Sequence, residues 1–377
     1  MKDLLIAVDP GFDSMKVIAN GVAFKFPFNA VRTDEAMISN FAIQDDFILY
    51  RDDLGATYRV GSYAREMIFD KKTTDPSELT DFYTEERFLS EEFKVGLRCA
   101  IAMAINSTGS YGEQEDLNIY LMLTLPHACR QQFAASLVGS VVGQHKFALR
   151  IGNTPIRDFS YTVSNDHVFT ISQTIAAILG ETSDIDGNIS EEKFKYLSEG
   201  PTLVIDGGYY TTGIVMVSRG GSVDDAMTES NTDFAMKNVN MAVVEALKAY
   251  RPDLRHYMIE YMIGTGNTKI KYMNSETKKA DTLDIRNVRK EKIAKVCQGL
   301  IQHMNERYND LLDINYVLVT GGTGAKFYPH LIRYYEEHGI MDKDHMLLTS
   351  CEMGDKKLSI EYAIAIGGYK GLRGSIG

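Results

Sequence analysis

Three stretches of the chain share one pattern of hydrophobic and polar positions. In each, a run of apolar residues ends at a turn that contains glycine; the stretches are 4–19 (LLIAVDPGFDSMKVIA), 202–217 (TLVIDGGYYTTGIVMV) and 316–327 (YVLVTGGTGAKF). Short apolar runs bounded by turn residues predict buried strands. The first two stretches become apolar again after the turn, so each predicts a strand–turn–strand unit. The third predicts a strand that leads directly into a helix.

The remaining pattern alternates between strands and helices. Segment 117–126 (LNIYLMLTLP) is almost continuously apolar and ends at a proline, which predicts a buried central strand. Further strand-like patterns lie around 47–64, at 145–152 and at 157–163. Apolar residues at helical spacing predict helices at 90–107, 129–143, 168–181, 233–249, 288–312 and 359–370.

The pattern near Leu4 recurs near Leu203. In both places a strand ends at an aspartate followed by glycine, a second apolar strand returns, and a helix and another buried strand come later. This recurrence predicts a duplicated α/β architecture with a cleft between the halves. A chain of 377 residues suggests two domains. We place domain I at 1–170, with the C-terminal helix 358–377 packing back on it, and domain II at 171–357.

Composition narrows the class of protein. The formal net charge of −11 argues against a general nucleic-acid surface, because phosphate neutralisation needs clustered Lys and Arg. The four cysteines form no CxxC pair and no HExxH is present, which disfavours a zinc site and favours a reducing cytosol. The sequence shows no signal peptide and no membrane span. We therefore expect a soluble, cytoplasmic protein that holds no transition metal.

The turn residues have the chemistry of a phosphate site. Glycines such as Gly11 and Gly208 leave no Cβ between the backbone and a ligand, and successive N–H groups in such turns converge on an anion. Lys16 lies on the returning strand, where its ammonium could reach phosphates. Asp9 and Asp206 sit at strand ends and would repel phosphate directly, so we expect a hydrated Mg²⁺ between them and the ligand.

The third glycine cluster, Gly321 to Gly324, allows the chain to turn closely against a flat ligand or a phosphate before a helix starts. It matches neither GxGxxG nor GxxxxGK[ST], so a dinucleotide fold and a P-loop are disfavoured. Each turn taken singly is better explained as an ordinary turn. The three together favour one bound nucleotide.

The motifs DPGFDSMK, DGGYYTT and VTGGTGAKF, in this order and at these separations, resemble the phosphate-1, phosphate-2 and adenosine motifs of the actin-like ATPases. The compact length, the LTLP strand end and the ending IEYAIAIGGYKGL are similar to bacterial actins of the ParM type, which segregate plasmids. The resemblance spans 6–368. It implies a duplicated actin-like, ribonuclease H-like fold of two domains around a cleft that holds ATP, or GTP, and Mg²⁺.

The resemblance also implies a function. It implies filaments that assemble with ATP and disassemble after hydrolysis, and that move plasmid DNA through a centromere-binding adaptor of the ParR type. Direct nucleic-acid binding and membrane association are not expected. Asp9 and Asp206 match the acids that hold the hydrated metal. The phosphate-binding set is Gly11, Phe12, Asp13, Ser14, Lys16, Gly207, Gly208, Tyr209 and Thr211, and the nucleoside-binding set is Lys237, Asn238, Gly321, Gly322 and Thr323.

One position departs from the family pattern, and the hydrolytic residue can be assigned only by its position along the chain. The second loop of the family ends in Asp, where this chain has Gly213, which puts the rigidity of the loop in doubt. ParM-like proteins carry a hydrolytic acid between a strand and the helix that links the domains. Matching by position gives Asp166 this role, with Asn165 next, to orient the attacking water. The alternative for Asp166 is a helix N-cap, and for Lys237 and Asn238 a solvated helix face.

Segment 266–292 carries many Lys and Arg residues in an otherwise acidic chain. It is either a solvated loop and helix start, or a filament contact that pairs with an acidic surface such as 74–92. Head-to-tail stacking of identical copies generates an open filament. The competing functions are a small-molecule kinase of the sugar- or acetate-kinase kind, which shares the phosphate loops, and a cell-shape bacterial actin. A chaperone ATPase of the heat-shock type would need a further domain.

Overall fold

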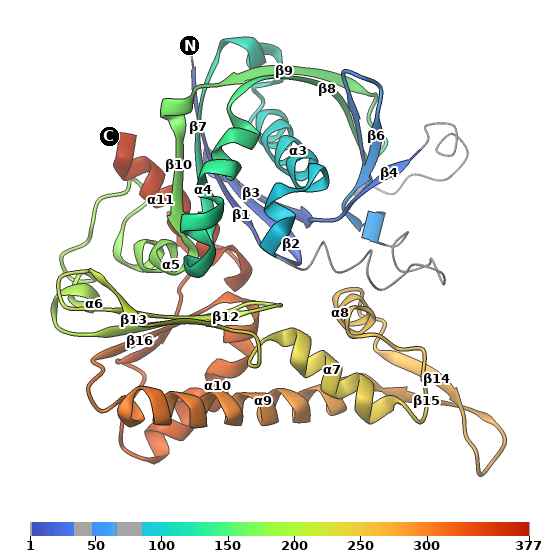
Figure 1. Ribbon diagram of the computed structural model, residues 1–377, viewed down its shortest axis with the longest axis vertical. Helices are drawn as coiled ribbons and strands as arrows, with labels where there is room; N and C mark the ends of the chain where they lie inside the picture. The colour runs from blue at the N-terminus through green and yellow to red at the C-terminus, as the bar shows by residue number, and fades with distance from the viewer. Residues whose placement is uncertain (1, 34–46, 63, 66–84, 377) are drawn as a thin grey trace. The chain divides into compact units, whose positions relative to one another are not determined.

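The computed structural model describes residues 2–33, 47–62, 64–65 and 85–376, which form two compact units (Figure 1). The first unit holds Met1–Phe194 and Ser350–Gly377, and the second holds Lys195–Thr349. These boundaries differ from the predicted domain limits at 170 and 358. The reason is that α5 (Gln173–Thr182) packs against α11 (Ala363–Ile376) within the first unit. The two helices approach closely at Gly367, where a Cβ would lie 1.6 Å from the Ala176 carbonyl oxygen.

The main sheet of the first unit has the strand order β10-β7-β1-β2-β3. Strands β1, β7 and β10 are parallel, whereas β1, β2 and β3 form antiparallel hairpins. On β1, Leu4 and Ile6 face the core that includes α3, while Leu5 and Ala7 face the core of α11. Both faces are covered, which explains the continuous apolar run. The bounds are β1 Lys2–Pro10, β2 Ser14–Ala19, β3 Val22–Pro27, β7 Leu117–Leu125, β10 Val168–Ser172 and α3 Glu91–Ser107.

A second sheet of the first unit is antiparallel and has the order β4-β6-β5-β8-β9. Its bounds are β4 Ala30–Thr33, β5 Ile48–Asp52, β6 Thr57–Val60, β8 Gly143–Ile151 and β9 Arg157–Val163. The other elements of the unit are α4 His127–Val141, the short hairpin β18 Glu352–Met353 and β19 Lys356–Lys357, and the 3₁₀ turns η3 Glu85–Leu89, η4 Tyr111–Asp116, η5 Asn165–His167 and η7 Ile360–Tyr362.

The main sheet of the second unit repeats that of the first. Its order is β13-β12-β11-β16-β17, with β11, β16 and β17 parallel and β11, β12 and β13 antiparallel. In the first hairpin Asp9 pairs with Lys16, and in the second Asp206 pairs with Gly213, so both turns have the same length. This register confirms the predicted duplication. The bounds are β11 Thr202–Gly207, β12 Thr212–Val217, β13 Val223–Asn231, β16 Tyr316–Thr320 and β17 Met346–Leu348.

Helices and one small hairpin complete the second unit. The long helix α9 and the helix α10 pack on the apolar face of the sheet, where Leu203, Val317 and Phe327 are fully buried. The hairpin β14–β15 leads directly into α9 (Figure 1). The bounds are α6 Lys195–Ser198, α7 Met236–Leu247, α8 His256–Gly264, β14 Lys269–Met273, β15 Ala280–Asp284, α9 Ile285–Arg307, η6 Asn309–Leu311 and α10 Gly321–Glu337.

Two predicted elements differ from the structure. Residues 168–172, predicted as the start of a helix, form β10, because this β-branched and aromatic segment pairs with β7; the helix begins only at Gln173. Segment 266–292, predicted as a loop and helix start, contains the hairpin β14–β15. Within the described ranges, none of the helices has the length and hydrophobicity that a membrane span requires.

Candidate functional site

The first candidate loop joins β1 to β2 and centres on Asp9. This carboxylate is buried at the carboxyl end of β1, where Oδ1 accepts hydrogen bonds from Thr124 Oγ1 (3.0 Å) and Gln173 Nε2 (2.8 Å). The ammonium of Lys16, its cross-strand partner, lies 3.4 Å from Oδ2. Because β1, β7 and β10 are parallel, their carboxyl ends bring these groups to one edge of the sheet. The carboxylate is thereby fixed in position at this edge.

Arg87 supports this loop and was not found by sequence reasoning. Its buried guanidinium donates to the carbonyl oxygens of Pro10 (2.6 Å) and Gly11 (3.0 Å), and it stacks on the ring of Phe12 at 3.8 Å. In a trans peptide the C=O and the following N–H point in opposite directions. The amides of Gly11 and Phe12 are therefore turned away from Arg87, as an anion-binding turn requires. Sequence reasoning missed Arg87 because it lies in the acidic segment 74–92.

The remaining residues of the first loop have distinct places. Gly11 makes room for Lys16, since a Cβ at this position would lie 2.4 Å from Nζ. Asp13 forms an ion pair with Arg65 at 3.0 Å, so its carboxylate supports the loop from the side. Ser14 begins β2 and is buried.

The second and third loops pack backbone against backbone in the second unit. Asp206 lies at the carboxyl end of β11, beside Gly213 on β12 and Thr320 on β16. A Cβ on Gly207 would lie 2.2 Å from the Gly324 nitrogen. Gly321 has a φ of +80°, and a Cβ there would lie 2.4 Å from the Gly207 carbonyl oxygen. This approach admits only glycine.

Hydrogen bonds join these two loops to α7. Thr323 Oγ1 donates to the Gly208 carbonyl oxygen (2.7 Å), and the Gly208 amide donates to the Thr211 carbonyl (2.9 Å). The Lys237 amide donates to the Tyr209 carbonyl (2.8 Å). Helix α10 begins with Gly321 and Gly322, so its first-turn amides form the positive end of the helix at this edge.

The side chains of Tyr209, Tyr210, Lys237 and Asn238 have partners within the second unit. Lys237 Nζ donates to the Tyr210 hydroxyl (2.6 Å) and lies 4.0 Å from the centre of that ring. Asn238 donates to the carbonyls of Thr232 (2.8 Å) and Asp233 (3.0 Å). The Tyr209 hydroxyl is hydrogen-bonded to His256 Nδ1 at 3.0 Å. These side chains are therefore held by hydrogen bonds within the second unit and do not form a solvated polar face.

We expect the second unit to lose stability at acidic pH through His256. Burial, and to a lesser extent Lys237, lowers the pKa of His256 to about 4, whereas an unfolded histidine has a pKa of about 6.5. The unfolded chain binds a proton at His256 more readily than the folded chain does. The free energy of unfolding is therefore not reduced by His256 above about pH 6.5, and it falls as the pH drops toward 4. Thermal unfolding at pH 7.5 and 5 tests this: His256→Asn should reduce the drop in melting temperature, and an unchanged drop would contradict it.

The predicted hydrolytic residues Asp166 and Asn165 are not at the edge that holds Asp9. They form an exposed 3₁₀ turn immediately before β10, and Val168 at the start of β10 pairs with Leu121 of β7. Asp9 follows Val8, which pairs with Leu123 further along β7. Asp166 therefore lies at the amino end of the parallel strands, whereas Asp9 lies at the carboxyl end. The structure therefore does not bring Asp166 and Asn165 to Asp9, because residues 168–172 form β10 and separate this turn from the carboxyl ends of the strands.

Gln173 occupies the place that Asp166 was expected to fill. It follows β10 directly, is the first residue of α5, and its amide reaches Asp9. Ser172 caps the helix by accepting from the Ile175 amide (3.3 Å). The signal in the sequence was Ser172 before an apolar helical run, a typical N-cap.

Taken separately, the loops of each unit carry groups of the kind that bind a magnesium nucleotide. A hydrated Mg²⁺ needs only one or two carboxylates and otherwise keeps its water. Each unit presents one aspartate at a strand end, Asp9 in the first unit and Asp206 in the second. Lys16 and the two glycine turns would bind the phosphates. Among the residues that the structure describes, no group of three His, Cys, Asp or Glu gathers as an all-protein metal site.

Comparison with known proteins gives the fold. No protein-family model matches the sequence, and no curated protein matches it either. Similar solved structures include a non-polymerisable quadruple mutant of pCBH ParM (TM-score 0.70, 18% identity, 98% of both chains) and a 15-stranded ParM filament from Clostridium botulinum (0.66, 17%, 98% of both chains). Another is an archaeal actin homologue in complex with ADP (0.63, 13%, 97% of this chain and 98% of the other). The chain has the actin-like fold, as its motifs indicated.

Proposed function

We propose that this chain is a nucleotide-dependent, filament-forming actin-like ATPase. The observation that carries the proposal is Asp9, a buried carboxylate bound by Thr124, Gln173 and Lys16 at the same strand edge as a glycine turn. A second aspartate, Asp206, holds the equivalent place in the repeated sheet. In this proposal both edges bind one Mg²⁺–nucleotide, whose phosphates lie on the two turns and whose base lies near the Gly321 turn.

Within this site Gln173 would orient the attacking water. Phosphoryl transfer depends mainly on positioning and on charge stabilisation, so an amide side chain suffices for this role. The ammonium of Lys16 would balance charge on the phosphates, while Thr124 and Gln173 keep Asp9 in place. Bound Mg²⁺ would supply charge neutralisation at the phosphate oxygens.

Gln173→Ala is expected to slow phosphate release by about ten- to a hundredfold while filaments still assemble. Loss of the amide removes the group that orients water and one of the two hydrogen bonds to Asp9 Oδ1, whereas Thr124 and Lys16 still hold that carboxylate. Asp166→Ala is the matched control and should hydrolyse at the wild-type rate. A single-turnover phosphate-release assay measures the rate of both variants. Slow release in Asp166→Ala with normal release in Gln173→Ala would instead identify Asp166 as the residue that orients the attacking water.

Filament formation is the second part of the proposal. The structural neighbours include a ParM filament and an Alp12 filament. The acidic chain suits movement of DNA through a centromere-binding adaptor rather than by direct contact. Sedimentation of the purified protein with ATP or GTP and Mg²⁺ tests assembly. Nucleotide-dependent pelleting is expected, and its absence at all concentrations would leave a small-molecule kinase as the alternative. Phosphate transfer to a panel of sugars and acetate would then identify that activity.

A further inference from the structure

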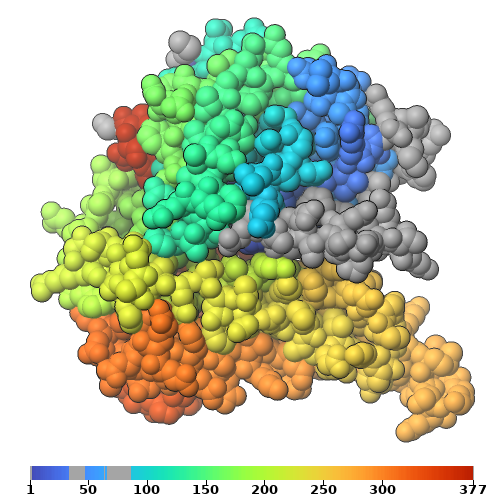
Figure 2. All heavy atoms as spheres, viewed as in Figure 1, coloured from blue at the N-terminus to red at the C-terminus, as the bar shows by residue number. Residues whose placement is uncertain are grey.

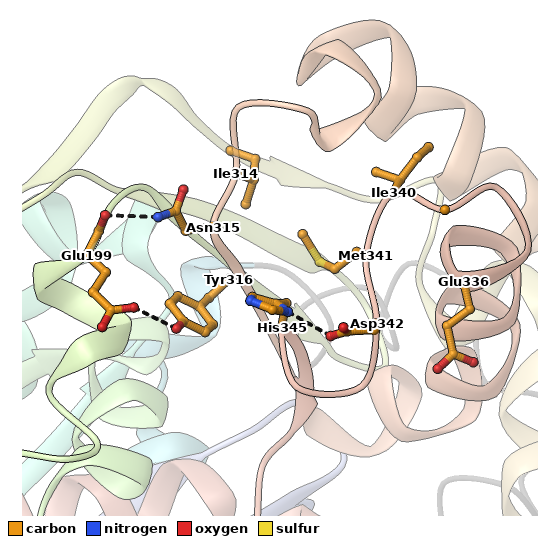
Figure 3. Close-up of a pocket in the computed structure, with 10 residues that line it drawn as sticks. Glu199, Ile314, Asn315, Tyr316, Glu336, Ile340, Met341, Asp342 and His345 are labelled. Carbon is orange, nitrogen blue, oxygen red and sulfur yellow. Dashed lines mark hydrogen bonds and ion pairs between the residues drawn. The ribbon is translucent and has the colours of Figure 1, made fainter.

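A cavity of about 660 Å³ lies in the second unit at the amino ends of β11, β16 and β17 (Figure 3). Glu199 precedes β11, Tyr316 begins β16, and His345 immediately precedes β17. The candidate nucleotide turns follow β11 and β16 at their carboxyl ends. Because the three strands are parallel, the cavity is at the opposite edge from those turns, and the proposed nucleotide site does not use it.

The cavity combines an apolar floor with acidic walls. Ile314 and Met341 are buried in its lining, whereas Glu336 and Asp342 are exposed at its rim. Among its lining residues there are three carboxylates and no Lys or Arg. Figure 3 shows Glu336 on helix α10 and Asp342 on a separate loop segment. Such a lining suits an apolar side chain that has cationic side chains beside it.

Hydrogen bonds keep the walls of the cavity in place. The Tyr316 hydroxyl donates to Glu199 Oε2 (2.8 Å), and Asn315 Nδ2 donates to the Glu199 carbonyl oxygen (2.9 Å). His345 stacks on Tyr316 with ring centres 5.4 Å apart, and its Nδ1 lies 2.7 Å from Asp342 Oδ1. The cavity is therefore built by fixed side chains at the strand ends.

The hairpin β14–β15 carries the complementary side chains. Lys269, Lys271 and Met273 alternate along β14 and share its exposed face, where Met273 is 66% exposed. Across the hairpin Lys271 faces Thr282 and Met273 faces Ala280. Lys269 faces Asp284, whose carboxylate is ion-paired with Arg286. No ion pair among the described residues joins these two lysines to a carboxylate. Figure 2 shows the hairpin, in light orange, projecting from the second unit.

The hairpin and the cavity lie at opposite ends of the same helix. β15 ends at Asp284, which caps α9, and α9 runs for 23 residues to Arg307, shortly before Ile314 of the cavity. At 1.5 Å per residue the helix is about 34 Å long. A copy therefore presents its hairpin at one end of α9 and its cavity at the other. Two different surfaces that match each other generate a head-to-tail contact and an open filament.

We propose that the β14–β15 hairpin of one copy docks in the amino-edge cavity of the next copy. Met273 enters the apolar floor, and Lys269 and Lys271 meet Glu336 and Asp342. This contact specifies the filament interface and so rests on the proposed function. It replaces the acidic segment 74–92, of which residues 74–84 lie outside the described residues, as the partner of the basic segment.

Reversal of single charges tests the pairing. Lys271→Glu and Asp342→Lys should each raise the critical concentration for assembly about tenfold, and the two together in one chain should restore it, because the charges again attract. Lys146→Glu and Glu115→Lys, exposed positions of the first unit, are matched controls and should assemble normally. All six proteins should bind nucleotide equally. Normal assembly of both single variants, or no recovery in the double variant, would overturn the contact.

Disulfide cross-linking separates this contact from filament formation as such. The four native cysteines are buried, so Met273→Cys mixed with Ile340→Cys should give a cross-linked dimer, and a chain with both substitutions should give a ladder. Leu54→Cys in place of Met273→Cys is the control. If the cysteine variants form filaments as wild type does but give no cross-link, the proposed contact is refuted and the proposed function is not. The same holds if an adaptor, and not a second copy, is cross-linked in the cavity. A cross-link without filaments would refute only the proposed function, and neither product would refute both.

Discussion

Asp206→Asn is expected to weaken magnesium-dependent nucleotide binding by about ten- to a hundredfold, the range for a group that orients a metal through its water shell. The amide keeps the shape of the side chain beside Gly213 and Thr320 but removes the charge that the cation requires. Titration with ATP in the presence of Mg²⁺ measures the loss. In EDTA the variant and wild type should bind ATP equally weakly.

The control for this substitution is Asp225→Asn, an exposed aspartate on β13 of the same unit. It should bind Mg–ATP as wild type does, which shows that lowering the net negative charge is not the cause. An equal melting temperature for Asp206→Asn and wild type without nucleotide excludes unfolding. Full affinity in Asp206→Asn would remove this aspartate from the proposed metal site.

Gly207→Ala is the second substitution with a large expected effect. The new Cβ would lie 2.2 Å from the backbone nitrogen of Gly324, so one of the two loops must move. Forced contacts of this kind cost about 1–3 kcal/mol of unfolding free energy. The displaced loops would also lose the arrangement that brings their amides to one ligand, so we expect nucleotide affinity to fall below detection.

Gly264→Ala provides the matched control, because it lies at the end of α8 in the same unit and its Cβ would meet no atom within 4 Å. Denaturant unfolding and nucleotide titration of both variants test the prediction. If Gly207→Ala were as stable and as active as Gly264→Ala, the backbone-to-backbone packing of the two loops would be wrong.

The hairpins that carry Asp9 and Asp206 were predictable because a hairpin is determined by residues that are close together in the sequence. An apolar strand, an aspartate at its end and a glycine turn fix a hairpin, and equal spacing gives the observed pairs with Lys16 and Gly213. The duplicated sheet followed from this recurrence. Lys237 and Asn238 were correctly placed at the start of α7, although their partners could not be read from the pattern.

The supporting residues were not predictable in the same way. Arg87 reaches the first loop from a segment more than seventy positions away, and nothing near it in the sequence shows that its guanidinium is buried. Gln173 was missed because the apolar residues of β10 also match helical spacing, and only pairing with β7 decides between the two. The cavity at the strand starts depends on three separate segments meeting in space, which periodicity does not reveal.

A double-mutant cycle between Asp9→Asn and Asp206→Asn, read as ATP affinity with Mg²⁺ and with EDTA, tests the central claim most directly. If both carboxylates hold one hydrated cation, the second substitution should cost far less than the first, with an interaction of about 1 kcal/mol or more in Mg²⁺ that disappears in EDTA. Strictly additive losses in Mg²⁺ would mean that the two aspartates do not share a cation, and would contradict the account.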